Sequence, residues 1–330
     1  MIERTPGLEL VRITEAAAIA AAHFMGHGDN READHAAVEA MRQTMDEVSF
    51  RGTVVIGEGE RDEAPMLYIG EKVGKGVGPD VDIAVDPLEG TNLVAKGRAN
   101  AIAVMAVAEQ GGLLNAPDTY MDKLCVGAPA RGKVDLDRPV AENLKIIADS
   151  LNRDVEDLTV VILDRARHGK LINDVREAGA RIKLIEDGDV IAALSVAVAG
   201  TAVHAVMGIG GAPEGVLGAA ALRCLGGEIL GRLRFRNDDE RARAKRMGIT
   251  DENRIYRTED LASGKDLRFV ATGVTDGELL QGVHFFGSGI VSGPGGVRTH
   301  SVLLDGTRGK LRFIDTQHFD DPQRPPVIRL

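Results

Sequence analysis

Tryptophan is absent from this chain, and aromatic side chains make up only 3% of it. Stacking platforms for bases or sugar rings are therefore scarce. The chain has only two cysteines, Cys125 and Cys224, and neither has another cysteine nearby. This argues against a disulfide framework and against a thiolate metal site, so we expect both thiols to be reduced.

Long apolar runs are also missing, since none approaches the roughly 18 residues that cross a membrane. Residues 1–5 lack the basic and apolar regions of a secretory signal, so we expect a cytoplasmic protein with no membrane partner. The net charge of −10 disfavours nucleic acid as a partner, because nucleic-acid-binding domains carry a basic patch. An acidic protein can still bind a phosphorylated metabolite where cations and arginines reverse the local field.

The length of 330 residues allows two domains, and we expect two α/β domains, 1–155 and 156–330. The first begins with helices over about 14–25, with Thr14 as the N-cap, and about 33–48. From residue 158 onward, strands and helices alternate as β-α-β-α-β-α, which predicts a parallel sheet. Three further strands are expected at 267–271, 296–304 and 310–316, the last two as a hairpin. Whether these strands return to the first domain is open from the sequence.

The most informative stretch is the apolar strand at 81–85, which ends in Asp86-Pro87-Leu88-Glu89-Gly90-Thr91. The proline and glycine predict an immediate turn, with two carboxylates and a hydroxyl at the strand end. Carboxylates beside a buried strand are costly unless a cation or hydrogen-bond donor compensates, so the pattern favours a metal site. An acidic surface turn is the alternative.

A second strand, 53–56, also runs into acids, in Gly57-Glu58-Gly59-Glu60. The glycines on both sides of Glu58 would let a ligand approach the backbone closely and let the Glu58 carboxylate point in many directions. A flexible acidic turn is the alternative. Asp34 lies at the start of the second predicted helix. Taken alone, that position favours a helix cap over a metal ligand.

Three strand ends in the second half carry groups suited to a phosphorylated polyol. They are Asp164-Arg165-Ala166-Arg167-His168, Glu186-Asp187-Gly188-Asp189 and Gly208-Ile209-Gly210-Gly211-Ala212-Pro213-Glu214. Guanidinium groups bind phosphate, carboxylates suit sugar hydroxyls, and a glycine loop can open a helix. Because the carboxyl ends of parallel strands share one edge, we expect these groups to converge. Each could separately be a surface charge or turn residue.

Asp86–Thr91 together with Gly57–Glu60 resembles the metal-binding signature of the lithium-sensitive sugar and inositol phosphatases. Residues 55–60, 63–74 and 208–215 are more closely similar to class II fructose-1,6-bisphosphatase of bacteria, and the likeness runs from about residue 15 to 316. It implies a layered αβαβα fold and Mg²⁺- or Mn²⁺-dependent removal of the 1-phosphate of fructose 1,6-bisphosphate. Residues 283–286 and 296–299 resemble photosynthetic members, which also act on sedoheptulose 1,7-bisphosphate.

The resemblance also implies the residues of a site. The implied metal ligands are Asp34, Glu58, Asp86, Glu89 and Glu214. The implied catalytic residues are Glu60, Asp86 and Thr91, with the Thr91 hydroxyl orienting and deprotonating the attacking water. The implied substrate contacts are Glu89, Gly90, Thr91, Tyr120, Arg165, Ala166, Arg167, Asp187, Gly188, Asp189 and Gly211. A homo-oligomer, dimer or tetramer, is expected.

Our leading hypothesis is thus a metal-dependent fructose bisphosphatase of gluconeogenesis. A bifunctional enzyme that also uses the sedoheptulose substrate is the alternative, with an inositol-phosphate phosphatase less favoured. A nucleotide-dependent oxidoreductase is suggested by Gly208-Ile209-Gly210 after a strand, but the glycine spacing is wrong for that fold. A non-catalytic sugar-phosphate binder would keep the arginines without needing five convergent acids.

Overall fold

Helices and strands fill most of residues 7–59, 66–286 and 295–319, the parts that this computed structural model describes. The helices are α1 (Gly7–Ala22), α2 (Asn30–Met45), α3 (Thr91–Ala95), α4 (Val140–Leu151), α5 (Gly169–Glu177), α6 (Asp189–Ser195), α7 (Ala212–Leu225), α8 (Asp238–Arg246) and α9 (Thr258–Leu261). One sheet contains β1 (Arg51–Ile56), β2 (Lys72–Val73), β3 (Asp80–Glu89), β4 (Ile102–Glu109), β11 (Arg268–Gly273), β12 (His284–Phe286), β13 (Gly296–Asp305) and β14 (Lys310–Phe319). The other contains β5 (Tyr120–Val126), β6 (Thr159–Leu163), β7 (Arg181–Ile185), β8 (Ala205–Gly211), β9 (Glu228–Arg234) and β10 (Tyr256–Arg257).

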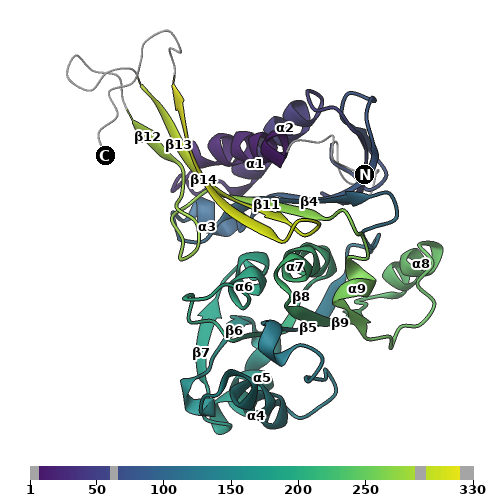
Figure 1. The fold of residues 1–330 in the computed structure, drawn as a ribbon, viewed down its shortest axis with the longest axis vertical. Coiled ribbons are helices and arrows are strands. Elements are labelled where there is room, and N and C mark those ends of the chain that lie inside the picture. The colour runs from purple at the N-terminus through teal and green to yellow at the C-terminus, as the bar shows by residue number, and fades with distance from the viewer. Residues whose placement is uncertain (1–6, 60–65, 287–294, 320–330) are drawn as a thin grey trace.

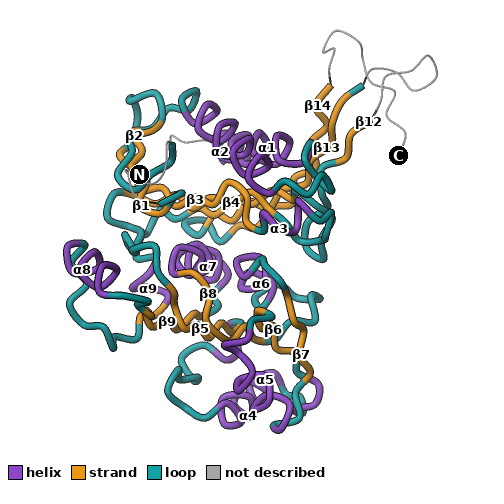
Figure 2. Tube along the Cα trace, turned by 180° about the vertical axis from the view of Figure 1, so that it is seen from behind, coloured by secondary structure: helices purple, strands orange, loops and turns teal. Residues whose placement is uncertain are grey.

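The elements stack in five layers (Figure 1). Helices α1 and α2 cover the outer face of the first sheet, α6 and α7 lie between the two sheets, and α4 and α5 cover the outer face of the second sheet. Figure 2 shows the same order from behind. Each sheet therefore buries both faces against helices. The predicted αβαβα fold of the α/β class is confirmed.

In the first sheet the strand order is β12-β13-β11-β4-β3-β1-β2, and β14 pairs with β13. Only β1 and β3 pair in parallel among these strands. The strands after residue 267 thus join the sheet that holds β3, and the predicted β13–β14 hairpin is confirmed. The division into domains at residue 155 stays a prediction. Strand β5 comes before residue 155, but it belongs to the same sheet as β6 to β10.

The second sheet has the order β10-β9-β5-β8-β6-β7. Strand β6 is parallel to β7 and to β8, as the alternating pattern predicts. The sheet as a whole is mixed, because β5, which lies outside that series, inserts antiparallel between β8 and β9. We expected a loop around Tyr120, since Pro117 and the polar residues beside it are typical of turns.

The first helix begins at Gly7, so the prediction of Thr14 as its N-cap is wrong. Thr14 lies inside the helix, where its hydroxyl donates to the Val11 carbonyl (3.0 Å) and lies 2.8 Å from the hydroxyl of Thr272. The second helix begins at Asn30 and is capped by Asp29, which accepts from two backbone N–H groups. Asp34 is therefore not a cap, and its carboxylate is available for another role.

No helix among the described residues is long and apolar enough to cross a membrane.

Candidate active site

A cavity of about 390 Å³ is lined by residues from both sheets. It gathers most of the predicted site residues: Asp34, Asp86, Glu89, Gly90, Thr91, Tyr120, Arg165, Arg167, Asp187, Gly188, Asp189, Gly211 and Glu214. Of the remaining three, Glu58 lies close enough to Asp86 to raise its pKa, whereas Ala166 is exposed and does not line the cavity. Glu60 falls outside the described residues.

The end of β3 places two acids on one side of this cavity. The register of β3 against β4 shifts between Asp86 and Glu89, so Pro87, which has no N–H to donate, sits where the ladder is irregular. The predicted immediate turn at the proline is wrong for this reason, since the strand continues to Glu89. Gly90 then turns the chain with φ 92° into α3, whose first residue is Thr91.

The acids of the cavity raise one another's pKa. Burial, followed by the nearby charges of Glu89 and Glu58, raises the pKa of Asp86 well above its ordinary value. Burial, Asp34 and Glu214 raise the pKa of Glu58 to about 8. These groups therefore repel one another when ionised, and a bound cation would offset that repulsion.

Two carboxylate oxygens in this group are buried without a hydrogen-bond partner, Glu89 Oε2 and Glu214 Oε2. The other oxygen of Glu89 accepts from the Val190 N–H at 2.6 Å. Oxygens of this kind are the ligands that Mg²⁺ and Mn²⁺ prefer. The donor set thus fits a divalent cation. Within the described ranges, however, no three or more acidic, histidine or cysteine side chains are placed so that they could together hold a metal ion.

The turn after β6 carries Arg165 and Arg167. His168 braces this turn, because its Nδ1 lies 2.7 Å from the Leu163 carbonyl and its Nε2 accepts from the Ile209 N–H at 2.8 Å. Donation from Nδ1 to a carbonyl and acceptance at Nε2 describe a neutral ring with the proton on Nδ1. Arg167 then donates to the Ile209 carbonyl through Nε (3.2 Å) and Nη2 (2.7 Å).

Asp187 links the two sides of the site. Its Oδ1 lies 3.4 Å from Arg165 Nη2, and its Oδ2 accepts from Asn92 Nδ2 at 3.1 Å. Asn92 follows Thr91 in α3, beside the first sheet, whereas Asp187 follows β7 of the second sheet. The contact therefore ties α3 to the loop after β7.

The glycines of β8 let a buried ion pair and an acid approach the backbone. A Cβ at Gly210 would meet Asp189 Oδ2 at 2.0 Å, and Asp189 is paired with the buried Lys123. A Cβ at Gly211 would meet Glu214 Oε2 at 1.8 Å. The space for both carboxylates exists only because these positions lack side chains.

Several residues at this site were missed from the sequence. Asn92, Asp118, Thr119 and Arg236 line the cavity, and Lys123 lies behind it. Asn92 directly follows the Thr91 of the metal signature, a signal that could have found it. The sequence around Lys123 and around Arg236 carries no such signal. Each would be taken for an ordinary surface cation, and only the fold brings it to the site.

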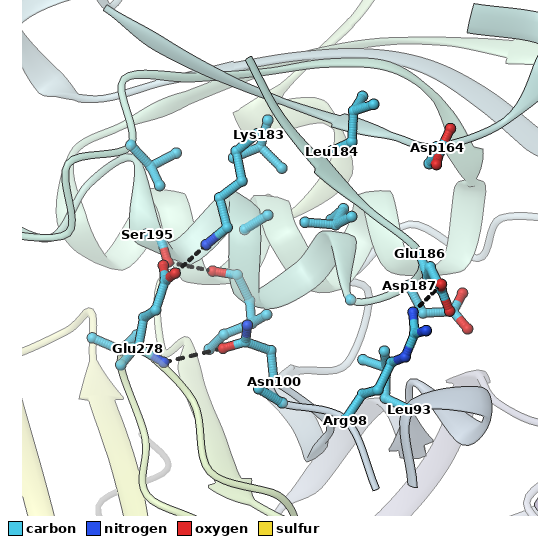
Figure 3. Close-up of a pocket in the computed structure, with 18 residues that line it drawn as sticks. Leu93, Arg98, Asn100, Asp164, Lys183, Leu184, Glu186, Asp187, Ser195 and Glu278 are labelled. Atoms are coloured by element: carbon cyan, nitrogen blue, oxygen red, sulfur yellow. Dashed lines mark hydrogen bonds and ion pairs between the residues drawn. The ribbon is translucent and has the colours of Figure 1, made fainter. Parts of the chain in front are cut away.

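A neighbouring cavity of about 460 Å³ shares Asp187 and Gly188 with the first (Figure 3). Ion pairs cross it between the two sheets, from Lys183 to Glu278 and from Arg98 to Glu186. In Figure 3 these pairs stand at opposite sides of the cavity. They hold the loop after β7, and with it Asp187, against the first sheet.

Metal-free protein should lose stability as the pH rises from about 5 to about 8. The pKa is about 8 for Glu58 and about 7 for Glu214 in the folded protein, against an ordinary value of 4.5. The folded form thus holds protons that the unfolded form releases, and this stabilising difference disappears as the pH passes the folded values. Thermal unfolding in a chelator at pH 6 and pH 8 should show the lower midpoint at pH 8.

The matched control for this pH effect is the double variant Glu58→Gln with Glu214→Gln, in which neither side chain titrates. Its unfolding midpoint should differ less between pH 6 and pH 8 than that of the parent protein. An equal difference in both proteins would show that other groups set the pH dependence.

Comparison with known proteins gives a consistent result over the whole chain. The family described as bacterial fructose-1,6-bisphosphatase, glpX-encoded, matches residues 4–318. The chain is 51% identical to the D-fructose 1,6-bisphosphatase class 2/sedoheptulose 1,7-bisphosphatase of Synechococcus sp. (strain JA-3-3Ab), with 98% of each chain covered. A protein of the same name from Microcystis aeruginosa is 49% identical, with 100% of each chain covered. Another from Trichodesmium erythraeum is also 49% identical, with 94% of this chain and 95% of the relative covered. This chain therefore belongs to the bacterial, glpX-encoded fructose-1,6-bisphosphatase family.

Proposed function

We propose that this chain hydrolyses the 1-phosphate of both fructose 1,6-bisphosphate and sedoheptulose 1,7-bisphosphate. Family membership supports the first activity. Relatives matched over nearly their full length carry both activities in their names, which favours the bifunctional alternative over the single-substrate hypothesis that we put first. The observation that carries the proposal is one cavity that is lined by both converging carboxylates and arginines.

The acid side would hold the cations. Glu89 and Glu214 each offer an unpartnered buried oxygen, and Asp34 and Glu58 lie close enough to Asp86 to raise its pKa. Mg²⁺ or Mn²⁺ suits this all-oxygen set better than zinc does. When bound, such cations lower the pKa of an attacking water and neutralise charge on the phosphoryl group.

The side chains of this chain supply the orientation. Thr91 begins α3 directly after Gly90 and lines the cavity together with the acids. Its hydroxyl would help to orient the attacking water and to relay the proton of that water to a carboxylate. The carbonyl-anchored Arg167 and the Asp187-paired Arg165 would bind phosphate, and the carboxylate of Asp187 would accept from sugar hydroxyls. A dimer or tetramer stays a prediction, which sedimentation would test.

Phosphate release tests the dual activity. With Mn²⁺ present, we expect turnover of both bisphosphates and little turnover of an inositol monophosphate. If one site serves both sugars, each should inhibit hydrolysis of the other, with an inhibition constant equal to its own KM. Turnover of the fructose substrate alone would return the chain to the single-substrate hypothesis, and preferential turnover of the inositol phosphate would contradict both.

Replacing Arg165 by alanine should raise KM for fructose 1,6-bisphosphate about tenfold, because a hydrogen bond to a charged group is worth roughly 1.5–3 kcal/mol. Steady-state kinetics would measure this. Arg181→Ala is the matched control: Arg181 lies in β7, is exposed, and donates to the Asp157 carbonyl away from the cavity. An equal KM change in both variants would argue against a direct phosphate contact.

A further inference from the structure

Arg236 is a cation of the cavity with no role so far. It follows β9 and lines the cavity with Arg165 and Arg167. These three are the only basic side chains among the described residues that line it, against a much larger number of acids. The acids repel the phosphate that does not react, so a substrate with two phosphates needs the few arginines of the cavity to bind that phosphate.

Arg236 and Arg167 lie over the same aromatic ring. The guanidinium carbon of Arg167 is 4.9 Å from the centroid of the Tyr120 ring, and that of Arg236 is 5.1 Å from it. Both distances are within the range of a cation–π contact. Tyr120 thus contacts both cations, and an anion that contacts both guanidinium groups would offset their mutual repulsion.

Hydrogen bonds to Glu240 also hold Arg236 in place. Glu240, of which only 1% is exposed, accepts from the Arg236 backbone N–H at 2.7 Å and pairs with Arg236 Nε. The same carboxylate accepts from the Thr119 hydroxyl at 2.7 Å, next to Tyr120. Glu240 pairs with Nε of the Arg236 guanidinium, and Nη2 donates to the Asp118 carbonyl at 3.5 Å, so the N–H groups of Nη1 remain for a ligand. The side chain is 49% exposed.

The two other arginines are partly committed elsewhere. Arg165 donates to the Asp164 carbonyl at 3.0 Å and lies 3.4 Å from Asp187. Arg167 spends two N–H groups on the Ile209 carbonyl. A doubly charged phosphate with three acceptor oxygens needs more donors than Arg167 alone has left.

We propose that Arg236, together with Arg167, binds the phosphate that is not hydrolysed, and so makes the site selective for sugar bisphosphates over monophosphates. This inference rests on the proposed function. It assigns Arg236 to specificity and not to the chemical step, for which the acids that would hold cations are proposed.

The test compares Arg236→Gln with the parent protein on fructose 1,6-bisphosphate and on fructose 1-phosphate, which lacks the second phosphate. KM for the bisphosphate should rise about tenfold or more, with kcat changed less than about threefold. The kcat/KM for fructose 1-phosphate should stay within about twofold of the parent value. By isothermal titration, affinity for fructose 6-phosphate, which carries only the non-reacting phosphate, should fall by a factor similar to the rise in KM.

Two further variants keep this test decisive. Arg236→Lys retains the charge and should recover part of the affinity for fructose 6-phosphate even if loss of the Glu240 contact loosens α8. Arg234→Gln is the matched control, since Arg234 is equally exposed, pairs with Asp122 and does not line the cavity. It should keep the parent KM.

Equal losses on the bisphosphate and on fructose 1-phosphate would overturn the inference, as would unchanged binding of fructose 6-phosphate by Arg236→Gln. A failure of the proposed function can be told apart from a failure of this inference, because it would be seen in the parent protein. If the parent with Mn²⁺ hydrolyses neither sugar bisphosphate, the function itself is wrong, whatever the variants bind.

Discussion

Asp86→Asn should lower kcat for fructose 1,6-bisphosphate by about 10³-fold, since losing a single charge-stabilising group in an active site costs roughly 10²–10³-fold. Asp86 lies at the irregular end of β3, and the charges of Glu89 and Glu58 help to raise its pKa. An amide keeps the shape of the side chain but cannot supply the negative charge that a divalent cation requires. Steady-state phosphate release at saturating Mn²⁺ is the measurement.

The same variant should be at least as stable as the parent when no metal is present. Asparagine removes a buried acid that its neighbours disfavour in the charged form, so the thermal midpoint in a chelator should not fall. Addition of Mn²⁺ should raise that midpoint less than it does in the parent, because binding to the folded state is weaker. Loss of activity with a lower metal-free midpoint would instead indicate a folding defect.

Asp80→Asn is the matched control for the charge. Asp80 lies at the other end of β3, exposed, and pairs with Arg51 at 2.7 Å. Exposed pairs contribute only about 0–1 kcal/mol, so activity and stability should stay close to the parent values. A similar loss of activity in both variants would contradict the assignment of Asp86 to the metal site.

Gly211→Ala should lower kcat/KM about 10²-fold while leaving the fold intact, comparable to the roughly 10–100-fold cost of disturbing the support of a metal ligand. The backbone at Gly211, with φ −70° and ψ 146°, suits alanine. The added Cβ would lie 1.8 Å from Glu214 Oε2, at the end of a flexible side chain. Glu214 must therefore swing away from the cavity, which removes one of the two unpartnered oxygens.

The dependence of activity on Mn²⁺ concentration would show this displacement, since half-maximal activity should need more metal in Gly211→Ala. Gly169→Ala is the control: Gly169 has helical angles, and a Cβ there meets nothing within 4 Å. Its activity should be unchanged. A Gly211→Ala protein with the parent metal dependence would show that Glu214 does not bind the ion.

The acid side of the cavity could be predicted because its pattern is local. An apolar strand that ends in Asp86 and Glu89, and a glycine-flanked Glu58, are visible within a few residues of sequence. The parallel pairing of β6 with β7 and β8 followed from the alternation of strands and helices after residue 158, whereas the layered fold was implied by the resemblance to a known family. These parts depend on short-range periodicity, which the sequence carries directly.

The remaining parts depend on contacts between distant residues. Tyr120 was expected in a loop, but pairing with β8 and β9 makes it the first residue of a strand. Arg236 reaches the cavity only because Glu240 holds it beside Thr119. Lys123 reads as a surface residue until the fold buries it against Asp189. Tertiary contacts of this kind leave no periodic signal in the sequence.

Phosphate release from fructose 1,6-bisphosphate, before and after removal of divalent metal, tests the central claim most directly. The site predicts turnover with Mn²⁺ or Mg²⁺, loss of turnover in excess chelator, and recovery when Mn²⁺ is restored. Undiminished turnover in the chelator, by protein shown to be free of metal, would contradict the assignment of the converging carboxylates to cations.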